Sequence, residues 1–272
     1  MTKAWVGHLY SVLLDLGIAG RKAIVCASSQ GLGRACAEAL SAEGVDVAIN
    51  GRDAEKLART AAAIRATTGG VVTPVAADIT TDEGRTALLA ACPEPDIVVI
   101  NNRGPRPGAL DEITDEDLQL ALDLHFWTPI KILQQVVPGM CERGFGRIVS
   151  ITSAMVTTPR PSMIASTGAR TGATAVLKAV SRDVARYDVT INCLLPERID
   201  SPRQEQMANI AVERDGITYD EARAQMADTI AAKRLGRTSE FGAACAFLCS
   251  VQAGFISGAN LHLDGGSYPG LV

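Results

Sequence analysis

A glycine-rich turn is the stretch of this chain whose residue types could most directly hold a ligand. Residues 23–27 are apolar and of strand type, residues 28–33 read Ser-Ser-Gln-Gly-Leu-Gly, and residues 34–40 carry apolar side chains at helical spacing. Glycines let a ligand approach the backbone, and the free N–H groups at a helix N-terminus attract phosphate. We therefore expect a nucleotide at this turn. The expected contacts are Ser28, Ser29, Gln30, Gly31, Leu32 and Gly33.

The second strand-like run ends at Asn50-Gly51-Arg52, about 20 residues after the glycine turn. A dinucleotide fold usually has an acid here, which binds the ribose 2′-hydroxyl. Because this chain has no carboxylate at the strand end and has a guanidinium close by, the sequence favours a 2′-phosphate. It predicts NADP(H) over NAD(H), with a solvated turn residue as the alternative for Arg52. Asp53 is expected to cap the helix that follows.

The elements that position these residues alternate between strand and helix from about residue 21 onward. Strands are expected at 22–27, 45–50, 71–77, 96–101, 146–152, 189–195 and 260–263. The alternation predicts an α/β protein with a single Rossmann-like, doubly wound parallel sheet of about seven strands and helices on both faces. One domain over residues 21–272 is expected, with 200–235 as a helical insertion on the substrate side.

Five arginines fall on loops at the predicted carboxyl ends of strands, where ligands bind in such a sheet. There they could meet an anionic substrate, whereas solvent exposure is the alternative for each of them. These residues are Arg103, Arg106, Arg160, Arg198 and Arg203.

Composition narrows the class of protein. A chain of 272 residues with 47% hydrophobic and 21% charged residues can bury a sizeable core as one domain. A net charge of -4 argues against a nucleic-acid surface. The seven cysteines are odd in number and scattered, which fits buried thiols in a reducing compartment and no metal site. Cys245 and Cys249 are interpreted as neighbours on a packed helix face.

The first 20 residues are expected to form an N-terminal extension of a cytoplasmic protein. They include Trp5, Leu9, Tyr10 and residues 12–14, but Asp15 interrupts the apolar run, and no secretory leader stands out. No later run approaches the roughly 18 apolar residues that a membrane span needs. The sequence thus predicts no membrane partner.

Several landmarks together resemble the short-chain dehydrogenase/reductase family. Cys26 to Gly33 looks like its Thr-Gly-x-x-x-Gly-x-Gly motif, with Ala27 in place of the first glycine. Further matches, which with the turn span about residues 18 to 268, are Asp78, Asn101-Asn102-Arg103-Gly104 and Leu263-Asp264-Gly265-Gly266. The resemblance implies that Asp78 and Ile79 lie near the adenine and that Asn101, Asn102, Arg103 and Gly104 line the cofactor's ribose.

The stretch after the sixth expected strand departs from this family. Where the family usually has Pro-Gly, the chain reads Pro196-Glu197-Arg198-Ile199-Asp200-Ser201. The resemblance implies cofactor contacts for Pro196, Ile199 and Ser201, and it places a carboxylate near the expected nicotinamide.

The resemblance also implies a catalytic set of Asn, Ser, Tyr and Lys. In this set a lysine lowers the tyrosine pKa from about 10, so that the tyrosine passes a proton while hydride moves. Ser153 matches the substrate-orienting serine, with a strand-end cap as its alternative. Ser166 stands at the tyrosine position and Arg170 at the lysine position. Serine is a much weaker acid than tyrosine, and arginine can hold ribose hydroxyls but relays no proton.

The asparagine position falls on His125. Pro129 cannot donate the helical hydrogen bond to the carbonyl of residue 125, so this carbonyl should be free and the helix should bend. The imidazole has an ordinary pKa near 6.5, which suits acid–base work at neutral pH. A core or interface histidine is the alternative, and both readings stay open.

Three hypotheses follow. The first is an NADP(H)-dependent oxidoreductase for a small hydroxy or oxo compound, expected to be anionic, with His125 or an ordered water replacing the tyrosine. The second is a non-redox enzyme on this scaffold, such as a retro-aldolase or isomerase, and the third is a catalytically silent nucleotide-binding subunit. A serine hydrolase is disfavoured because neither Ser153 nor Ser166 lies in a Gly-x-Ser-x-Gly elbow. The resemblance implies a homodimer or homotetramer through helices near 114–142 and 162–187.

Overall fold

A parallel sheet of seven strands forms the centre of the computed structural model, which describes residues 15–271. The strand order is β3-β2-β1-β4-β5-β6-β7, and every neighbouring pair is parallel. The doubly wound α/β fold is therefore confirmed, and each strand lies within two residues of its expected bounds. The strands are β1 (Lys22–Val25), β2 (Asp46–Gly51), β3 (Val72–Ala76), β4 (Ile97–Ile100), β5 (Gly146–Ile151), β6 (Val189–Pro196) and β7 (Asn260–Leu263).

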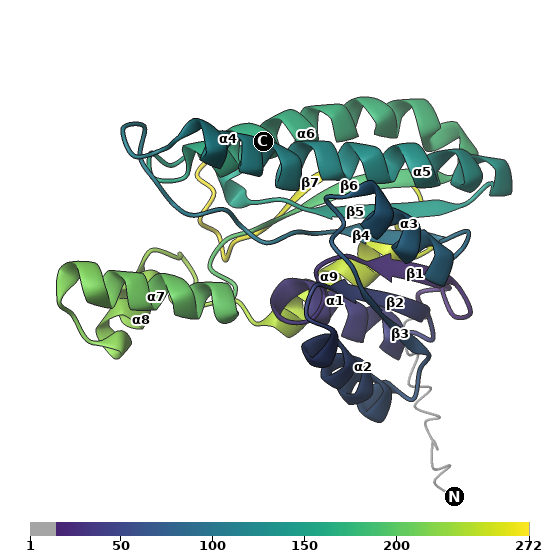
Figure 1. Cartoon of the computed structure of the whole chain (residues 1–272), viewed down its shortest axis with the longest axis horizontal. Coiled ribbons are helices and arrows are strands. Elements are labelled where there is room, and N and C mark those ends of the chain that lie inside the picture. The colour runs from purple at the N-terminus through teal and green to yellow at the C-terminus, as the bar shows by residue number, and fades with distance from the viewer. Residues whose placement is uncertain (1–14, 272) are drawn as a thin grey trace, which may run out of the picture.

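Helices cover both faces of the sheet (Figure 1). The core on one face draws side chains from α1, α2 and α9, and the core on the other draws them from α3, α5 and α6, with α4 packed beside α6. The bounds are α1 (Gly31–Ala42), α2 (Ala54–Thr68), α3 (Asp82–Ala91), α4 (Asp115–Leu122), α5 (Thr128–Arg143), α6 (Ile164–Val184), α7 (Pro202–Asp215), α8 (Tyr219–Asp228) and α9 (Thr238–Cys249).

Central strands with two buried faces explain why the apolar runs are continuous. In β4 all four side chains are buried, with Ile97 and Val99 in one core and Val98 and Ile100 in the other. Successive side chains of a strand point to opposite faces, so a strand covered by helices on both sides must be apolar throughout. This packing fixes the strand ends, and the loops that follow them carry the polar residues.

Helices α7 and α8 follow the end of β6 and stand out to one side of the sheet (Figure 1). They pack on each other through a small apolar cluster that includes Ala208, Ala222 and Met226. Thr218 caps α8 with a reciprocal bond to Glu221. The segment 200–235 thus contains two helices that do not belong to the layers on the sheet.

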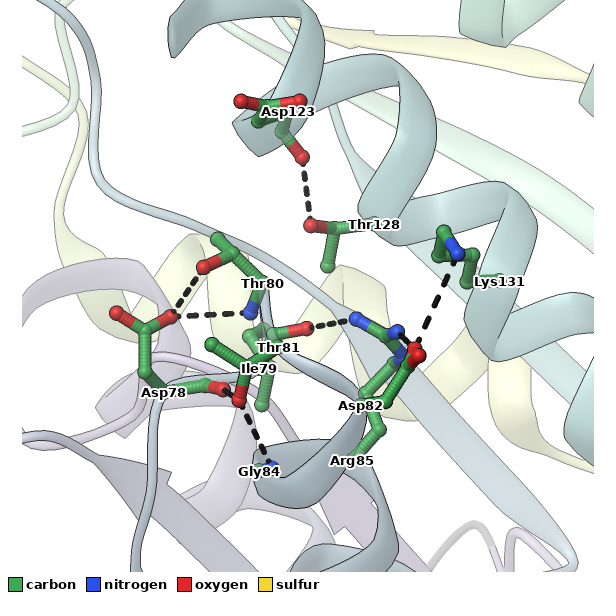
Figure 2. Close-up of polar contacts among 10 residues, drawn as sticks. All are labelled: Asp78, Ile79, Thr80, Thr81, Asp82, Gly84, Arg85, Asp123, Thr128 and Lys131. Carbon is green, nitrogen blue, oxygen red and sulfur yellow. Dashed lines mark hydrogen bonds and ion pairs between the residues drawn. The ribbon is translucent and has the colours of Figure 1, made fainter.

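A π-helical turn, η1 (Asp123–Trp127), interrupts the helix at the place where Pro129 was expected to disturb it. Thr128 donates both its backbone N–H and its hydroxyl to the carbonyl oxygen of Asp123, the latter over 2.6 Å (Figure 2). Proline at 129 lacks the N–H that a regular helix would offer there, and π-turns often mark functional sites. The irregularity places His125 and the carbonyl of Leu124 beside the strand ends.

Several smaller expectations can be compared with the structure. Asp53 caps α2 by accepting from the Lys56 N–H over 2.9 Å, as predicted. Cys245 and Cys249 are buried on the packed face of α9. Residues 1–14, including Trp5, lie outside the described residues, whereas residues 16 and 18 of the expected extension are buried in the core. Among residues 15–271 no helix has the length and apolar character needed to cross a bilayer.

Candidate functional site

One large cavity, of about 1400 Å³, lies at the carboxyl ends of the strands and extends beneath α7 and α8. Its wall includes the glycine turn after β1 at one end and Ser153 and Ser166 at the other. We call these the nucleotide end and the reaction end. A parallel doubly wound sheet places ligands at this edge, so the cavity lies where the sequence predicts it.

The glycine turn at the nucleotide end is held by close backbone packing. A Cβ on Gly33 would come within 2.5 Å of the carbonyl oxygen of Ala27, so a side chain there would push the turn away from α1. Ala27 itself adopts a left-handed φ of 45°, which explains why its family counterpart is usually glycine. Gly31, also left-handed, opens the first turn of α1 toward the cavity. The backbone N–H groups of that turn are therefore available to an anion.

Ser28 and Asn50 are used within the fold. The buried Ser28 hydroxyl donates to the Val25 carbonyl over 2.6 Å and accepts from the Asn50 N–H over 2.9 Å. The Asn50 amide donates to the carbonyls of Val75 and Ala77, which ties β2 to β3. These bonds position the turn. Because they occupy both side chains, recognition of a ligand beyond the end of β2 falls to the residues that follow Asn50.

Arg52 and Lys56 stand at the cavity rim beyond β2. The Arg52 side chain is 62% exposed, and its Nη1 lies 4.0 Å from Asp78 Oδ2. Lys56 contacts the side-chain oxygen of Gln30 in the glycine turn. The sequence reasoning missed Lys56, which lies in the first turn of α2 and lines the cavity as Arg52 does. The two cations form a site that fits a phosphate on the adenosine side of a nucleotide.

Asp78 lies in the loop between β3 and α3. Its carboxylate accepts from the Thr80 N–H over 3.0 Å and from the Thr80 hydroxyl over 2.7 Å (Figure 2). Burial opposes ionisation, but the Thr80 bonds and the charges of Arg52 and Arg103 outweigh it and lower the pKa of Asp78. Arg85, on α3, donates to the carbonyl of Ile79 and so fastens this loop to the helix (Figure 2). Asp78 and Ile79 both line the cavity.

The loop after β4 crosses the middle of the cavity. Asn101 donates to the Ala27 carbonyl over 3.3 Å, and Asn102 donates to the Leu124 carbonyl in η1 over 3.4 Å. The loop is thus fastened to the glycine turn on one side and to η1 on the other. Arg103 and Gly104 follow and line the cavity, as Asn101 and Asn102 do.

Arg170, on α6, connects the groups at the reaction end. Its Nη1 donates to the carbonyls of Ile151 and Thr152 at the end of β5, over 2.8 and 3.0 Å. Its Nε donates to Ser166 Oγ over 3.2 Å, and its Nη2 lies 3.3 Å from His125 Nε2. Burial and the nearby charge of Arg203 lower the pKa of Arg170 to about 10, so it stays protonated at neutral pH.

Two serine hydroxyls line the cavity beside this arginine. Ser166 accepts from Arg170, and Ser153 accepts from the Met155 N–H over 3.2 Å, which caps the 3-10 turn η2 (Ala154–Val156). Ser153 is therefore both a cap and a cavity-lining residue. Each oxygen already accepts a hydrogen bond from the protein, so each hydroxyl can still donate a hydrogen bond to a ligand.

His125 lies behind Arg170 and, in the described chain, outside the set of cavity-lining residues. Its side chain is 4% exposed. Arginine can only donate, so the imidazole Nε2 must accept and the ring is neutral. Burial, then the charges of Arg170 and Arg103, lower the pKa of His125 well below 6.5.

The loop after β6 closes the reaction end. Glu197, 8% exposed, contacts Arg160 over 3.0 Å and Arg198 over 3.4 Å. Arg198 has a left-handed φ of 53°, a strained conformation that is common at functional sites. The carboxylate expected near the nicotinamide is thus paired with two arginines expected to meet the substrate. Pro196, Ile199 and Ser201 also line the cavity.

The charge of the cavity wall is opposite to that of the whole chain. Nine cationic side chains and four carboxylates line it, an excess of five positive charges, whereas the chain carries -4. The cations are Arg52, Lys56, Arg103, Arg106, Arg160, Arg170, Arg198, Arg203 and Arg214. Such a wall concentrates anions. Within residues 15–271 no group of three or more His, Cys, Asp or Glu side chains could hold a metal ion.

Comparison with known proteins assigns the family. The profile of the family described as enoyl-(acyl carrier protein) reductase matches residues 26–268. The chain belongs to the short-chain dehydrogenase/reductase family. It is 30% identical to 3-oxoacyl-[acyl-carrier-protein] reductase FabG of Haemophilus influenzae, over 92% of this chain and 98% of that protein. It is also 28% identical to an uncharacterized oxidoreductase, YvaG, of Bacillus subtilis, over 93% and 98% of the two chains.

Solved structures agree with this assignment. L-sorbose reductase from Gluconobacter frateurii, complexed with NADPH and L-sorbose, matches with a TM-score of 0.90 and 27% identity over 95% of this chain and all of that one. YwfH, an NADPH-dependent reductase involved in bacilysin biosynthesis, matches with a TM-score of 0.86 and 26% identity over 92% and 99% of the two chains. The chain is thus a family oxidoreductase whose similar structures include NADPH complexes.

The cavity brings together most of the residues that the sequence singled out. Ser28, Gly33 and His125 are buried around it and hold or support its wall, and the other expected contacts line it. Arg106 lines it too, but its guanidinium is bonded to Asp117, so its charge is neutralised locally. The sequence did not show which carboxylates pair with the arginines of the cavity, because pairs such as Arg106 with Asp117 meet only after the chain folds.

Proposed function

We propose that the protein is an NADP(H)-dependent oxidoreductase that interconverts a carbonyl and a hydroxyl group on a small anionic compound. The observation that carries the proposal is that a single cavity runs from the helix N-terminus of α1 to the hydroxyls of Ser153 and Ser166. A nucleotide and a small substrate can therefore meet in it. NADPH in the names of L-sorbose reductase and YwfH supports this choice of cofactor.

The residues at the nucleotide end fit a dinucleotide. No room exists for a Cβ on Gly33, so α1 packs closely on the turn and its N-terminus is held where a pyrophosphate would bind. Gln30, Gly31 and Leu32 would hold the pyrophosphate at the N-terminus of α1, and Arg52 with Lys56 would hold a 2′-phosphate. When bound, this cofactor supplies or accepts a hydride.

At the reaction end, the hydroxyls of Ser153 and Ser166 would each donate a hydrogen bond to the substrate's carbonyl oxygen. In the reducing direction the carbonyl carbon gains a hydride and its π electrons move to the oxygen. The charge of Arg170 lies behind Ser166 and stabilises that oxygen as negative charge develops. The oxygen then takes one proton, so the ketone, the reduced cofactor and a proton yield the alcohol and the oxidised cofactor.

Water is the proposed source of this proton. His125 is neutral, hydrogen-bonded to Arg170 and separated from the cavity by it, so it carries no proton to give at neutral pH. Arg170 holds its proton tightly at that pH. The cavity is open enough to admit water beside both serines. His125 therefore acts through Arg170, as a positioning residue.

The experiment is a nicotinamide absorbance assay with purified full-length protein, NADPH and a panel of small oxo acids and neutral ketones. We expect turnover with at least one compound, and a kcat about 100-fold lower in Ser153→Ala because one oxyanion donor is lost. Ser239→Ala removes an exposed hydroxyl on α9 and should leave the rate unchanged. Tight NADPH binding with no turnover across the panel would instead favour the non-redox enzyme or the silent subunit.

A further inference from the structure

The cations of the cavity differ in whether the protein supplies a carboxylate for them. Arg106 pairs with Asp117, whereas Arg160 and Arg198 share Glu197. Arg170 and Arg203 form no ion pair with any of the residues 15–271. A partly buried cation without a counter-ion is costly, so an anionic ligand that reaches it is bound strongly.

Arg203 spans the cavity between α7 and the loop after β4. Its Nη1 donates to Gln206 Oε1 over 2.8 Å, and its Nη2 donates to the Pro105 carbonyl over 3.3 Å. The guanidinium carbon lies 3.6 Å from where a Cβ on Gly104 would stand, which is van der Waals distance, so the guanidinium packs against this loop. These two bonds hold the group still and, among the described residues, leave three of its five N–H groups for a ligand.

Arg170 has a single N–H group left. Four of its five donors are occupied by Ser166, the Ile151 and Thr152 carbonyls and His125. The fifth, on Nη2, remains free within the part of the chain that the structure describes. Arg170 and Arg203 both line the cavity, and the charge of Arg203 adds to burial in lowering the pKa of Arg170, so an anion that reaches both guanidiniums is favoured there.

We propose that Arg203, together with the last N–H group of Arg170, binds a carboxylate that the substrate carries beside its reacting carbon. The substrate is then a 2-oxo acid in the reducing direction and a 2-hydroxy acid in the oxidising direction. Its oxo oxygen meets Ser153 and Ser166 while its carboxylate bridges the two arginines. This inference rests on the proposed function, because it names the substrate class of the same site.

The phosphates of the cofactor are the other source of negative charge in the cavity. They are served by the N-terminus of α1, beyond β1, and by Arg52 and Lys56 at the nucleotide end. Arg170 is fixed instead to the end of β5 and to Ser166. We therefore assign the arginine pair to the substrate, and the experiment separates the two sources.

The test titrates the NADPH complex of the full-length protein with oxamate, a carboxylate that cannot be reduced, by calorimetry. We expect binding to the native protein and a loss of about 10-fold to 100-fold in Arg203→Gln, since the carboxylate loses a charge-assisted hydrogen-bonding partner. Arg203→Lys should recover part of the affinity, which guards against a misfolded variant. Arg59→Gln removes the same charge from an exposed guanidinium on α2, which pairs with Glu55 and is not among the described cavity-lining residues, and it should change the affinity less than about two-fold.

Kinetics complete the test. A 2-oxo acid and its uncharged amide are compared, and Arg203→Gln should raise the KM of the acid alone while the NADPH affinity stays unchanged. Equal turnover of acid and amide, with no effect of Arg203→Gln, would overturn the carboxylate site and leave the reductase standing. Oxamate binding that depends on Arg203, without any NADPH oxidation, would keep the site and overturn the reductase. A loss of NADPH affinity with unchanged oxamate binding would assign Arg203 to the cofactor and refute the inference.

Discussion

The two ends of the cavity are built in different ways. At the nucleotide end, backbone conformation makes the site: Gly33 permits close packing, and Ala27 adopts the left-handed conformation of the glycine it replaces. At the reaction end, side chains make the site, and Arg170 is joined by hydrogen bonds to Ser166 and His125. A backbone site tolerates few changes, whereas a side-chain site can be rebuilt for another substrate or step.

Two arginines on neighbouring elements sharpen this comparison. Arg147, in β5, is almost fully buried and pairs with Asp188 over 3.0 Å, and it also donates to the carbonyl of Ser250. Within residues 15–271, Arg170 is bonded only to neutral groups. A buried cation whose charge is balanced within the protein holds the fold, while one that is not balanced is available to a ligand.

The largest effect should come from replacing these arginines. Arg170→Ala should lower kcat/KM by roughly 1000-fold, because it removes the charge behind Ser166 and frees Ser166 and His125. Arg147→Ala should instead cost about 3 kcal/mol or more of folding stability and leave the rate per folded molecule near normal. Thermal unfolding and steady-state rates of both variants check this contrast. A normal rate in folded Arg170→Ala would end the assignment of this residue to the site.

A substitution in the glycine turn should have the next largest effect, on NADPH binding and on stability. Gly33→Ala should weaken NADPH binding by about 100-fold or more and destabilise the fold by about 2 kcal/mol, because the new Cβ meets the Ala27 carbonyl. In Gly168→Ala, on α6, the new Cβ meets nothing within 4 Å, so stability should stay equal or rise slightly. Fluorescence titration with NADPH compares them. Undiminished binding in Gly33→Ala would mean that the turn does not hold the pyrophosphate.

The preference for NADPH over NADH should change by a smaller factor when Arg52 is replaced. Arg52→Ser should weaken NADPH binding about 10-fold to 30-fold and leave NADH binding unchanged, since only the former carries the 2′-phosphate. Lys56→Gln should act in the same direction. Arg59→Gln, an exposed arginine on the same helix that pairs with Glu55, is the control. Equal losses of affinity for both cofactors would show that Arg52 does not recognise the 2′-phosphate on the ribose.

The smallest effect concerns pH. The pKa of His125 is lowered in the folded protein, so the unfolded state, with a pKa near 6.5, binds the proton more tightly. The stability that His125 contributes is complete above pH ~6.5 and is lost as pH falls below it, at up to about 1.4 kcal/mol per pH unit. Urea unfolding between pH ~5 and ~7 should therefore show a steeper pH dependence for the native protein than for His125→Gln. Identical slopes would show that His125 titrates normally.

The features that depend on the backbone could be predicted from the sequence, and those that depend on side-chain pairing could not. The strands, the glycine turn and the Asp53 cap depend on local spacing and conformation, so patterns of a few residues predicted them. The disturbance at Pro129 could also be expected, because a missing N–H has a local effect. These are features of the backbone.

The pairing of side chains could not be predicted in this way. Glu197 contacts Arg160, and Arg203 contacts the loop after β4, across separations of many residues that only the folded sheet brings together. His125 was expected as a candidate acid, but whether it faces the cavity depends on the space that Arg170 fills beside it. Such details depend on tertiary packing, which spacing along the chain does not encode.

The central claim is that Ser153, Ser166 and Arg170 support hydride transfer without a tyrosine. The most direct measurement incubates the protein with NADPH deuterated at C4 of the nicotinamide and a panel of 2-oxo acids, and then analyses the products by mass spectrometry. The account predicts a 2-hydroxy acid with deuterium on the hydroxyl-bearing carbon, formed by the native protein and much more slowly by Ser153→Ala. A product without deuterium, or no hydroxy acid from any compound in the presence of bound cofactor, would contradict it.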